Sequence, residues 1–122
     1  MRSSIERMPM LDESTRYRLL KLLETHPGLS QRQLARELGI SLGKVNFCLS
    51  ALIEKGLLKA SNFRNSQNKL AYMYLLTPAG VEEKTRITLQ YLKIKMREYE
   101  TLQSEIDELR REAASLQQEV RA

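Results

Sequence analysis

Apolar residues recur at helical spacing in three short stretches in the first half of the chain. The first stretch follows Asp12, a residue type that caps helices, and ends at His26-Pro27-Gly28. The second begins at Ser30, which can form a capping box with Gln33, and ends at Gly39. The apolar faces predicted for these two helices consist of Tyr17, Leu19, Leu20, Leu22 and Leu23 in the first and of Leu34, Ala35 and Leu38 in the second.

A third helix follows the second after a very short link. Only Ile40 separates Gly39 from Ser41, and Ser41 can cap a helix that is predicted from about Leu42 to Lys55, just before Gly56. Two helices joined this tightly must cross at a steep angle. The buried face predicted for the third helix consists of Val45, Leu49, Leu52 and Ile53.

Two strand-like runs come next, at residues 57–64 and 70–76, and a polar turn at 65–69 joins them into a hairpin. Thr77 and Pro78 then begin a last helix, because Thr caps helices and Pro is tolerated at the first helical position. No Gly or Pro follows Gly80, so this helix can continue to the C-terminus over about 60 Å. The pattern predicts a mainly α chain with a small β-hairpin. Its parts are a flexible arm at 1–11, a domain at 12–76 and a long helix at 77–122.

The last helix carries an apolar pattern of its own, with spacings that mostly alternate between three and four residues, as in a coiled-coil seam. The seam consists of Leu89, Leu92, Met96, Tyr99, Leu102, Ile106, Leu109, Ala113, Leu116 and Val120. The alternation fails once, at Tyr99, where a stammer would overwind the helices locally. A thin amphipathic helix of this length buries little against its own small domain. The seam therefore predicts a homodimer, in which the two helices run either parallel or antiparallel.

The charge is distributed unevenly between these parts. The net charge is +5, but residues 1–76 carry 12 Lys and Arg against 6 Asp and Glu, while residues 77–122 carry 8 against 9. A basic first part suits a polyanionic partner. One Cys allows no internal disulfide, the first residues lack the apolar run of a signal peptide, and no stretch is apolar enough to span a bilayer. We therefore expect a cytoplasmic protein that has no membrane partner.

A capped helix pair followed by a basic hairpin is typical of a winged helix-turn-helix that binds double-stranded DNA. In that arrangement the second helix of the pair lies in the major groove, and the helix before it crosses the phosphate backbone. We predict phosphate contacts from Gln31, Arg32 and Arg36, base contacts from Lys44, Asn46 and Ser50, and a minor-groove contact from Arg64 or Lys69. The same face of the third helix also presents Gly43 and Phe47 and carries no acid before Glu54.

These residues also resemble a known family. The segment SQRQLARELGISLGKVNFCLSALIEKGLL and the hairpin ending YLLTPAG resemble the DNA-binding part of MarR-type regulators, over residues 12–80. Within that family, GKVNFCLSALIEKGLLK is most similar to the MarR-like regulators associated with exopolysaccharide genes. The resemblance implies operator binding as a homodimer. It places recognition contacts at Ser41, Gly43, Lys44, Asn46 and Phe47 and wing contacts at Arg64 and Lys69. MarR-type proteins usually have a longer helical segment before the first core helix, which helps to form the dimer and a ligand pocket. Here only about eleven residues precede that helix, so the resemblance does not extend to control by an effector ligand.

Several of these residues have a second interpretation. Lys44, Asn46 and Ser50 could belong to an ordinary solvated helix face, and the four basic residues could serve only solubility; these four are Arg32, Arg36, Arg64 and Lys69. Phe47 could pack under the hairpin or contact a thymine methyl group. We interpret Tyr72 and Tyr74, which alternate along a strand, as structural residues that face the core or the dimer helix.

The remaining chemistry is sparse. Cys48 adjoins the buried face of the third helix and has no second Cys to resolve an oxidised thiol, so we interpret it as a core residue rather than a redox sensor. His26 stands at a helix end with no second His, which favours a capping role over a metal site. We expect no catalytic residues, no metal site and no cofactor. The main hypothesis is a dimeric regulator on a palindromic operator, and the alternative is a winged-helix adaptor whose coiled coil recruits another protein.

Overall fold

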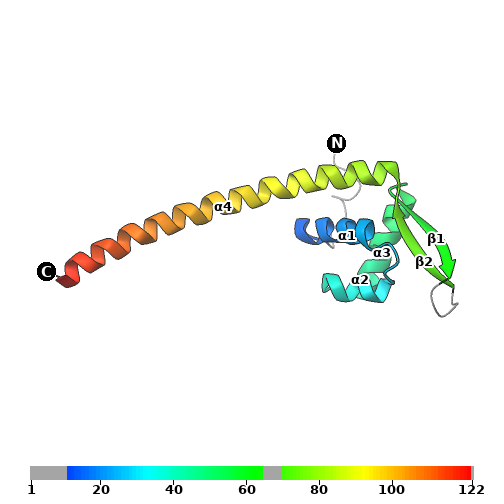
Figure 1. The fold of residues 1–122 in the computed structure, drawn as a ribbon, viewed down its shortest axis with the longest axis horizontal. Coiled ribbons are helices and arrows are strands. Elements are labelled where there is room, and N and C mark those ends of the chain that lie inside the picture. Colours follow the sequence, from blue (N-terminus) through cyan, green and yellow to red (C-terminus); the bar gives the residue numbers. More distant parts are fainter. Residues whose placement is uncertain (1–10, 65–69, 122) are drawn as a thin grey trace. The chain divides into compact units, whose positions relative to one another are not determined.

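The computed structural model describes residues 11–64 and 70–121. Its elements are α1 (Glu13–Thr25), α2 (Gln31–Leu38), α3 (Leu42–Glu54), β1 (Leu58–Arg64), β2 (Leu70–Leu76) and α4 (Pro78–Arg121) (Figure 1). This order confirms the predicted fold class, a winged helix-turn-helix followed by a long C-terminal helix. The chain divides into two compact units, Met1–Leu89 and Gln90–Ala122.

The three N-terminal helices begin and end at the residues that the sequence indicates. The Asp12 carboxylate accepts a hydrogen bond of 2.8 Å from the backbone N–H of Thr15 at the start of α1. At the start of α2, the Ser30 hydroxyl accepts from the Gln33 N–H at 3.1 Å, and the Gln33 side chain accepts from the Ser30 N–H at 2.8 Å. Gly39 ends α2 with a φ of 68°, a left-handed conformation that favours glycine. The capping box and the glycine stop are confirmed.

The core of the first unit lies between α1, α2, α3 and the hairpin. Its best buried side chains are at most 2% exposed and are Leu19, Leu20, Leu23, Leu34, Val45, Cys48, Leu49, Leu52 and Leu58. The prediction for Ile53 was wrong, because its side chain is 40% exposed. The buried stripe of α3 follows Val45, Cys48, Leu49 and Leu52, and Ile53 lies beyond its edge in the last turn of the helix.

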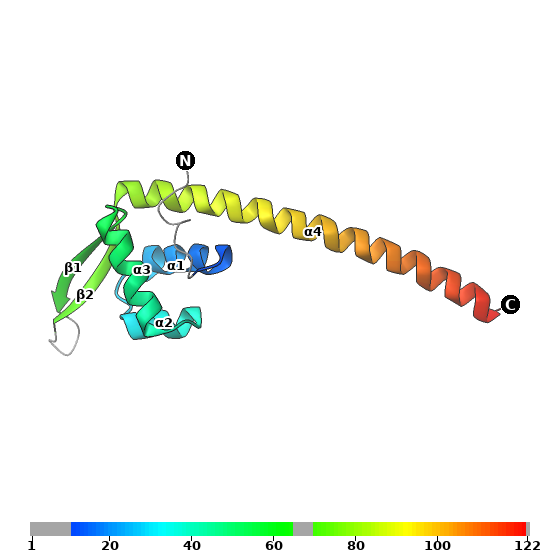
Figure 2. The same cartoon turned by 180° about the vertical axis from the view of Figure 1, so that it is seen from behind.

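The hairpin consists of β1 and β2 in antiparallel pairing, from Leu58 opposite Leu76 to Arg64 opposite Leu70. It lies beside α3 in both ribbon views (Figure 2). The backbone N–H of Tyr74 donates a hydrogen bond of 3.1 Å to the carbonyl of Pro27, which ties β2 to the link between α1 and α2. The hairpin thus contacts both α3 and the link between α1 and α2.

The junction between β2 and α4 is packed closely against the segment that follows α3. The Thr77 hydroxyl donates to the Gly56 carbonyl at 2.6 Å and accepts from the Gly80 N–H at 3.1 Å. A Cβ atom at Gly80 would lie 2.0 Å from the carbonyl oxygen of Leu57, so only glycine fits at this position. This close approach sets where α4 leaves the hairpin.

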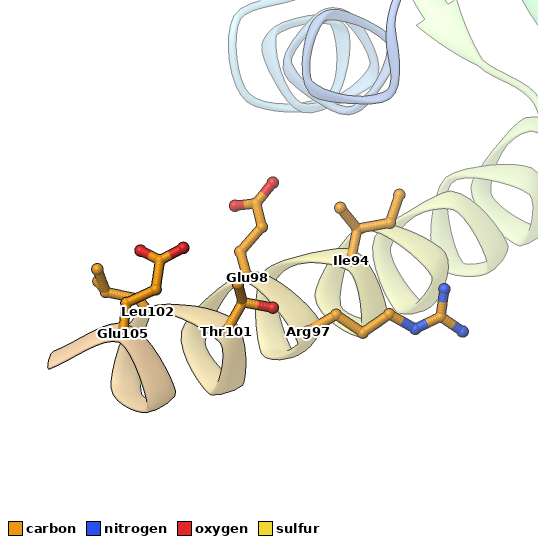
Figure 3. A pocket seen from close by; sticks show the side chains of 6 residues that line it. All are labelled: Ile94, Arg97, Glu98, Thr101, Leu102 and Glu105. Carbon is orange, nitrogen blue, oxygen red and sulfur yellow. The ribbon is translucent and has the colours of Figure 1, made fainter. Parts of the chain in front are cut away.

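The second unit, Gln90–Ala122, is the C-terminal part of α4. Its apolar seam is exposed along its whole length, from 39% for Ile106 to 87% for Val120. Side chains on this helix border an open depression of about 370 Å³, and Figure 3 shows Glu98 and Glu105 projecting from the same side. Across the residues described, no helix combines the length and the apolar character needed to cross a membrane.

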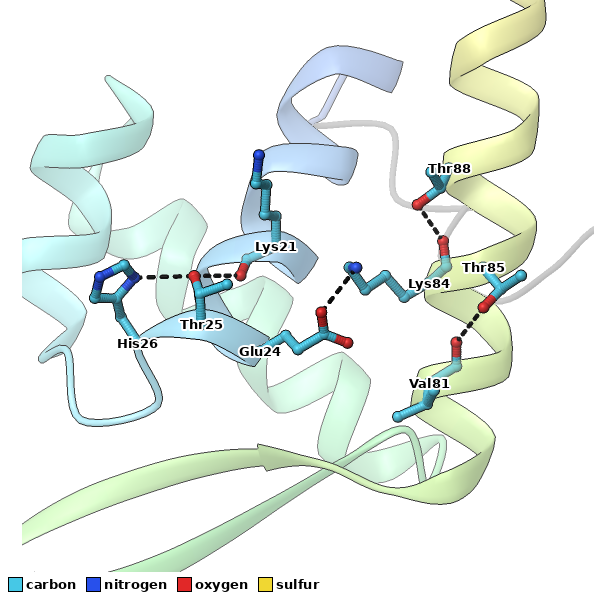
Figure 4. Close-up of polar contacts among 8 residues, drawn as sticks. All are labelled: Lys21, Glu24, Thr25, His26, Val81, Lys84, Thr85 and Thr88. Atoms are coloured by element: carbon cyan, nitrogen blue, oxygen red, sulfur yellow. Dashed lines mark hydrogen bonds and ion pairs between the residues drawn. The ribbon is translucent and has the colours of Figure 1, made fainter.

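The first turns of α4 belong to the first unit and pack against α1. Ile87 is 4% exposed, and the Lys84 ammonium lies 2.9 Å from the Glu24 carboxylate (Figure 4). On the far side of α1, the backbone N–H of His26 donates to the Leu22 carbonyl at 2.7 Å. His26 therefore occupies the C-cap of α1, as predicted, and caps it through its backbone. A favourable effect of its side chain on the helix dipole stays a prediction.

Candidate nucleic-acid interface

The face of α3 that is predicted to contact DNA lies outward, because the opposite side of the helix is buried in the core. A short link joins α3 to α2. The Ser41 hydroxyl accepts from the Lys44 N–H at 3.1 Å, and the Ile40 N–H donates to the Ala35 carbonyl at 3.1 Å. Arg18 of α1 donates to the carbonyl of Glu37, which joins α1 to the last turns of α2. These contacts fix the crossing of α2 and α3.

Five of the six residues predicted on or beside this helix as recognition residues are exposed, and Lys44 is partly buried. The five are Ser41, Gly43, Asn46, Phe47 and Ser50. Within α3 the one acid is Glu54, at the last position of the helix. The face therefore presents hydroxyl, amide, ammonium and aromatic groups with no carboxylate among them, as an element that enters the major groove requires.

Phe47 and Gly43 show how the N-terminal half of α3 suits a close approach to another surface. Phe47 is 50% exposed, so it is not a core residue, and Leu42 is 43% exposed. A Cβ atom at Gly43 would meet only the Ser41 hydroxyl, at 4.0 Å. No packing contact within the described residues requires glycine here, and the missing side chain leaves the start of α3 slim.

The basic residues of α2 lie one helical turn apart. Arg32 and Arg36 are both exposed, and within the described part of the chain neither is paired with a carboxylate. Their charges are available to phosphate groups. Gln31 is placed differently, because its side-chain amide donates to the Tyr74 hydroxyl at 3.1 Å and so connects α2 to β2. Its predicted phosphate contact stays a prediction.

The hairpin contributes one exposed aromatic residue that the sequence interpretation missed. Tyr74 is 6% exposed, which confirms it as a core residue, but Tyr72 is 58% exposed. The two rings are stacked with centroids 6.5 Å apart. Of the two wing residues, Arg64 closes β1 opposite Leu70 and only its backbone is described, and Lys69 lies outside the described residues.

Cys48 has the environment of a core residue. Its side chain is fully buried, and burial raises the pKa of the thiol, while the nearby charge of Lys44 acts weakly in the opposite direction. A raised pKa keeps the thiol protonated and poorly nucleophilic at neutral pH. The structure thus agrees with the interpretation of Cys48 as a small core side chain.

Comparison with known proteins agrees with the winged helix-turn-helix fold. Residues 12–59 match the family model described as winged helix-turn-helix DNA-binding. No curated protein matches the chain.

Among solved structures, the PcaV transcriptional regulator from Streptomyces coelicolor is similar with a TM-score of 0.54 and 25% identity, over 67% of this chain and 59% of that one. The multiple antibiotic-resistance repressor MarR from Listeria monocytogenes has a TM-score of 0.51 and 20% identity, over 98% and 80% of the two chains. FabT from Streptococcus pneumoniae, solved in complex with DNA, has a TM-score of 0.50 and 20% identity, over 75% and 62%.

The chain thus spans about 59% of the length of PcaV. The last two similarities concern the fold alone. The chain thus has the winged helix-turn-helix fold, residues 12–59 match a family model described as DNA-binding, and the solved structures of similar fold include a MarR repressor.

Proposed function

We propose that this chain is a transcriptional regulator that binds double-stranded DNA as a homodimer on a palindromic or nearly palindromic operator. One observation carries the proposal: α3 presents an exposed face with no acid before Glu54, inside a domain that matches winged helix-turn-helix DNA-binding proteins. A DNA-contacting helix needs such a face because phosphate oxygens and most major-groove atoms are acceptors or negatively charged.

The contacts divide into two kinds. Lys44, Asn46 and Ser50 read base edges, with Phe47 against a thymine methyl group, while Ser41 and Gly43 lie where α3 enters the groove. Phosphates are bound by Arg32 and Arg36, with Gln31 beside them, and the hairpin brings Arg64 and Lys69 to the adjacent minor groove. Base contacts give selectivity, whereas phosphate contacts give affinity that depends on salt.

Two copies are needed because one winged helix covers only half of an operator. The seam of α4 leaves its leucines more than half exposed in a single chain, which favours burial against a second copy. Two α3 helices related by a two-fold axis then reach successive major grooves about 34 Å apart. The seam members that would be buried are Leu89, Leu92, Met96, Tyr99, Leu102, Ile106, Leu109, Leu116 and Val120.

The genes under control are proposed from the sequence resemblance alone. The segment GKVNFCLSALIEKGLLK resembles regulators associated with exopolysaccharide genes, so the operator is expected near genes of that kind. The alternative is an adaptor protein whose α4 recruits a different partner. The acid-poor face of α3 favours the regulator, because an adaptor has no need of it.

A selection of genomic fragments followed by gel shifts separates the two functions. The double variant Lys44→Ala with Asn46→Ala should lose sequence preference, with a cost of about 1–3 kcal/mol for each base contact removed. The matched control is Arg111→Ala with Gln118→Ala, which removes the same types of group from exposed positions of α4 and should bind as the unaltered chain does. Binding without sequence preference, equal in all three proteins, would refute the regulator.

A further inference from the structure

The C-terminal part of α4 carries a regular heptad pattern from Tyr99 to Val120. Written as a heptad, the a positions are Tyr99, Ile106, Ala113 and Val120, and the d positions are Leu102, Leu109 and Leu116. All seven side chains are exposed in the single chain. Within parallel coiled coils, Ile and Val at a with Leu at d favour two strands over three or four, and Ile106 and Val120 fit that pattern.

This segment carries an open depression beside its seam. The depression, of about 180 Å³, is bordered by Asp107 and Arg110 and by four residues closer to the seam, which are Tyr99, Leu102, Gln103 and Ile106. These four residues have the spacing i, i+3, i+4 and i+7, which is the set that forms a hole for one knob of a facing helix. A helix with the same heptad supplies the matching knobs, and the second copy of this chain carries one.

The charges beside the seam discriminate between the two directions in which that copy could lie. The flank before the a positions is acidic throughout and consists of Glu98, Glu105, Glu112 and Glu119. The flank after the d positions has no acid and consists of Gln103, Arg110 and Gln117. All seven are exposed, and Figure 3 shows Glu98 and Glu105 of the acidic flank on one side of α4.

In an antiparallel pair the acidic flank of one helix lies beside the acidic flank of the other. Glutamates would then face glutamates along one side of the pair. In a parallel pair the acidic flank meets the opposite flank of the other helix, five residues further on. Glu105 then faces Arg110 of the second copy, and Glu98 and Glu112 face Gln103 and Gln117. Because two-fold symmetry repeats each contact, the parallel pair contains two ion pairs between Glu105 and Arg110. No two like-charged side chains of these flanks face each other in it.

We infer that residues 99–120 pair in parallel and in register with the same residues of a second copy, through the Leu102, Leu109 and Leu116 layers and the Glu105 to Arg110 ion pairs. This inference rests on the proposed homodimer. Since each helix joins its DNA-binding domain at the N-terminal end, both domains are attached at the same end of the coiled coil.

Charge reversal at one position tests the direction in the full chain. In a parallel pair, Glu105→Arg faces Arg110 of the second copy and should raise the dimer dissociation constant roughly threefold to tenfold, and the addition of Arg110→Glu should restore it. In an antiparallel pair the same Glu105→Arg relieves glutamate repulsion and tightens the dimer, which would overturn the inference. Glu108→Arg is the control, because Glu108 is exposed away from the seam. Analytical ultracentrifugation measures the constant.

Disulfide trapping gives an independent readout. Val120→Cys should cross-link to itself under mild oxidation, because an in-register a layer places the two Cβ atoms within disulfide reach. A mixture of Val120→Cys and Leu102→Cys should give no mixed disulfide, since these positions lie far apart along a parallel pair. The natural Cys48 is buried and can stay in place.

A dimer that yields only the mixed disulfide would overturn the direction and leave the homodimer standing. A chain that sediments as a monomer and yields no disulfide would instead overturn the homodimer itself.

Discussion

Leucine side chains form much of the core of the first compact unit and are exposed in the second. In the first unit Leu19, Leu20 and Leu34 are at most 1% exposed, whereas Leu102 and Leu109 of the second unit are 54% and 61% exposed. Buried leucines stabilise the domain within one chain, and exposed leucines at seam positions stabilise nothing until another helix covers them. The first unit thus has a closed core within one chain, whereas the second unit leaves its seam leucines exposed within that chain.

The strongest test removes one leucine from each unit. Leu34→Ala should lower the free energy of unfolding by about 2–5 kcal/mol at every protein concentration, because it leaves a cavity in a closed core. Leu109→Ala should leave the unfolding of the first unit unchanged and should raise the dimer dissociation constant. Urea unfolding followed by circular dichroism at two protein concentrations separates these effects. If Leu109→Ala lowered the free energy of unfolding equally at both protein concentrations, Leu109 would act within a single chain and not through a dimer.

A smaller effect is expected where the first unit is packed most closely. Gly80→Ala should cost about 1–3 kcal/mol, because its Cβ would overlap the Leu57 carbonyl and push α4 away from the end of α3. Gly43→Ala is the matched control, since its Cβ meets only the Ser41 hydroxyl at 4.0 Å and Ala is the better helix former. Thermal unfolding should rank Gly80→Ala lowest, and equal midpoints for the two variants would show that the junction has room to relax.

Features that depend on neighbouring residues could be predicted from the sequence, whereas contacts between distant segments could not. The capping box of Ser30 and Gln33 and the stop at Gly39 were predictable because each signal lies within a few residues. The apolar pattern of α4 is local too, and the structure has its side chains exposed, but their pairing with a second helix stays a prediction. Contacts between distant segments carried no such signal: the Gln31 amide meets the Tyr74 hydroxyl across 43 residues, and the requirement for glycine at position 80 comes from the Leu57 carbonyl.

Exposure was predicted more completely for the residues of α3 than for those of the hairpin. Helical period alone assigns Asn46 and Ser50 to the side opposite Val45 and Leu49, and the structure has them exposed. For Tyr72 the alternation of a strand placed it on the same face as Tyr74, but it could not tell how far along the strand the core extends. Tyr72 lies past that limit, which is why it is exposed and Tyr74 is buried.

The cap of α2 provides a third test, of about 1 kcal/mol. Ser30→Ala removes the hydroxyl that accepts from the Gln33 N–H, so it should destabilise the first unit by that amount. Ser115→Ala, at an exposed position inside α4, should change stability by less than about 0.5 kcal/mol. Chemical denaturation measures both. If Ser30→Ala proved neutral, packing alone would be holding the start of α2.

The smallest expected difference lies between two ion pairs, one in each unit. Lys84 and Glu24 join α4 to α1 with side chains 21% and 43% exposed, whereas Lys95 and Glu98 are neighbours on one helix and 52% and 60% exposed. Glu24→Gln should cost at most about 1 kcal/mol, and Glu98→Gln should cost less, because solvent screens the more exposed pair.

The hydrogen bond from Lys95 to Glu98 raises the pKa of Lys95, so Glu98→Gln should also lower that pKa toward its ordinary value, which an NMR titration detects. Added salt should reduce the stability difference for Glu24→Gln only in part, since its partner is largely covered. If salt abolished the effect of Glu24→Gln entirely, the contact between α4 and α1 would depend on Ile87 and its apolar neighbours alone.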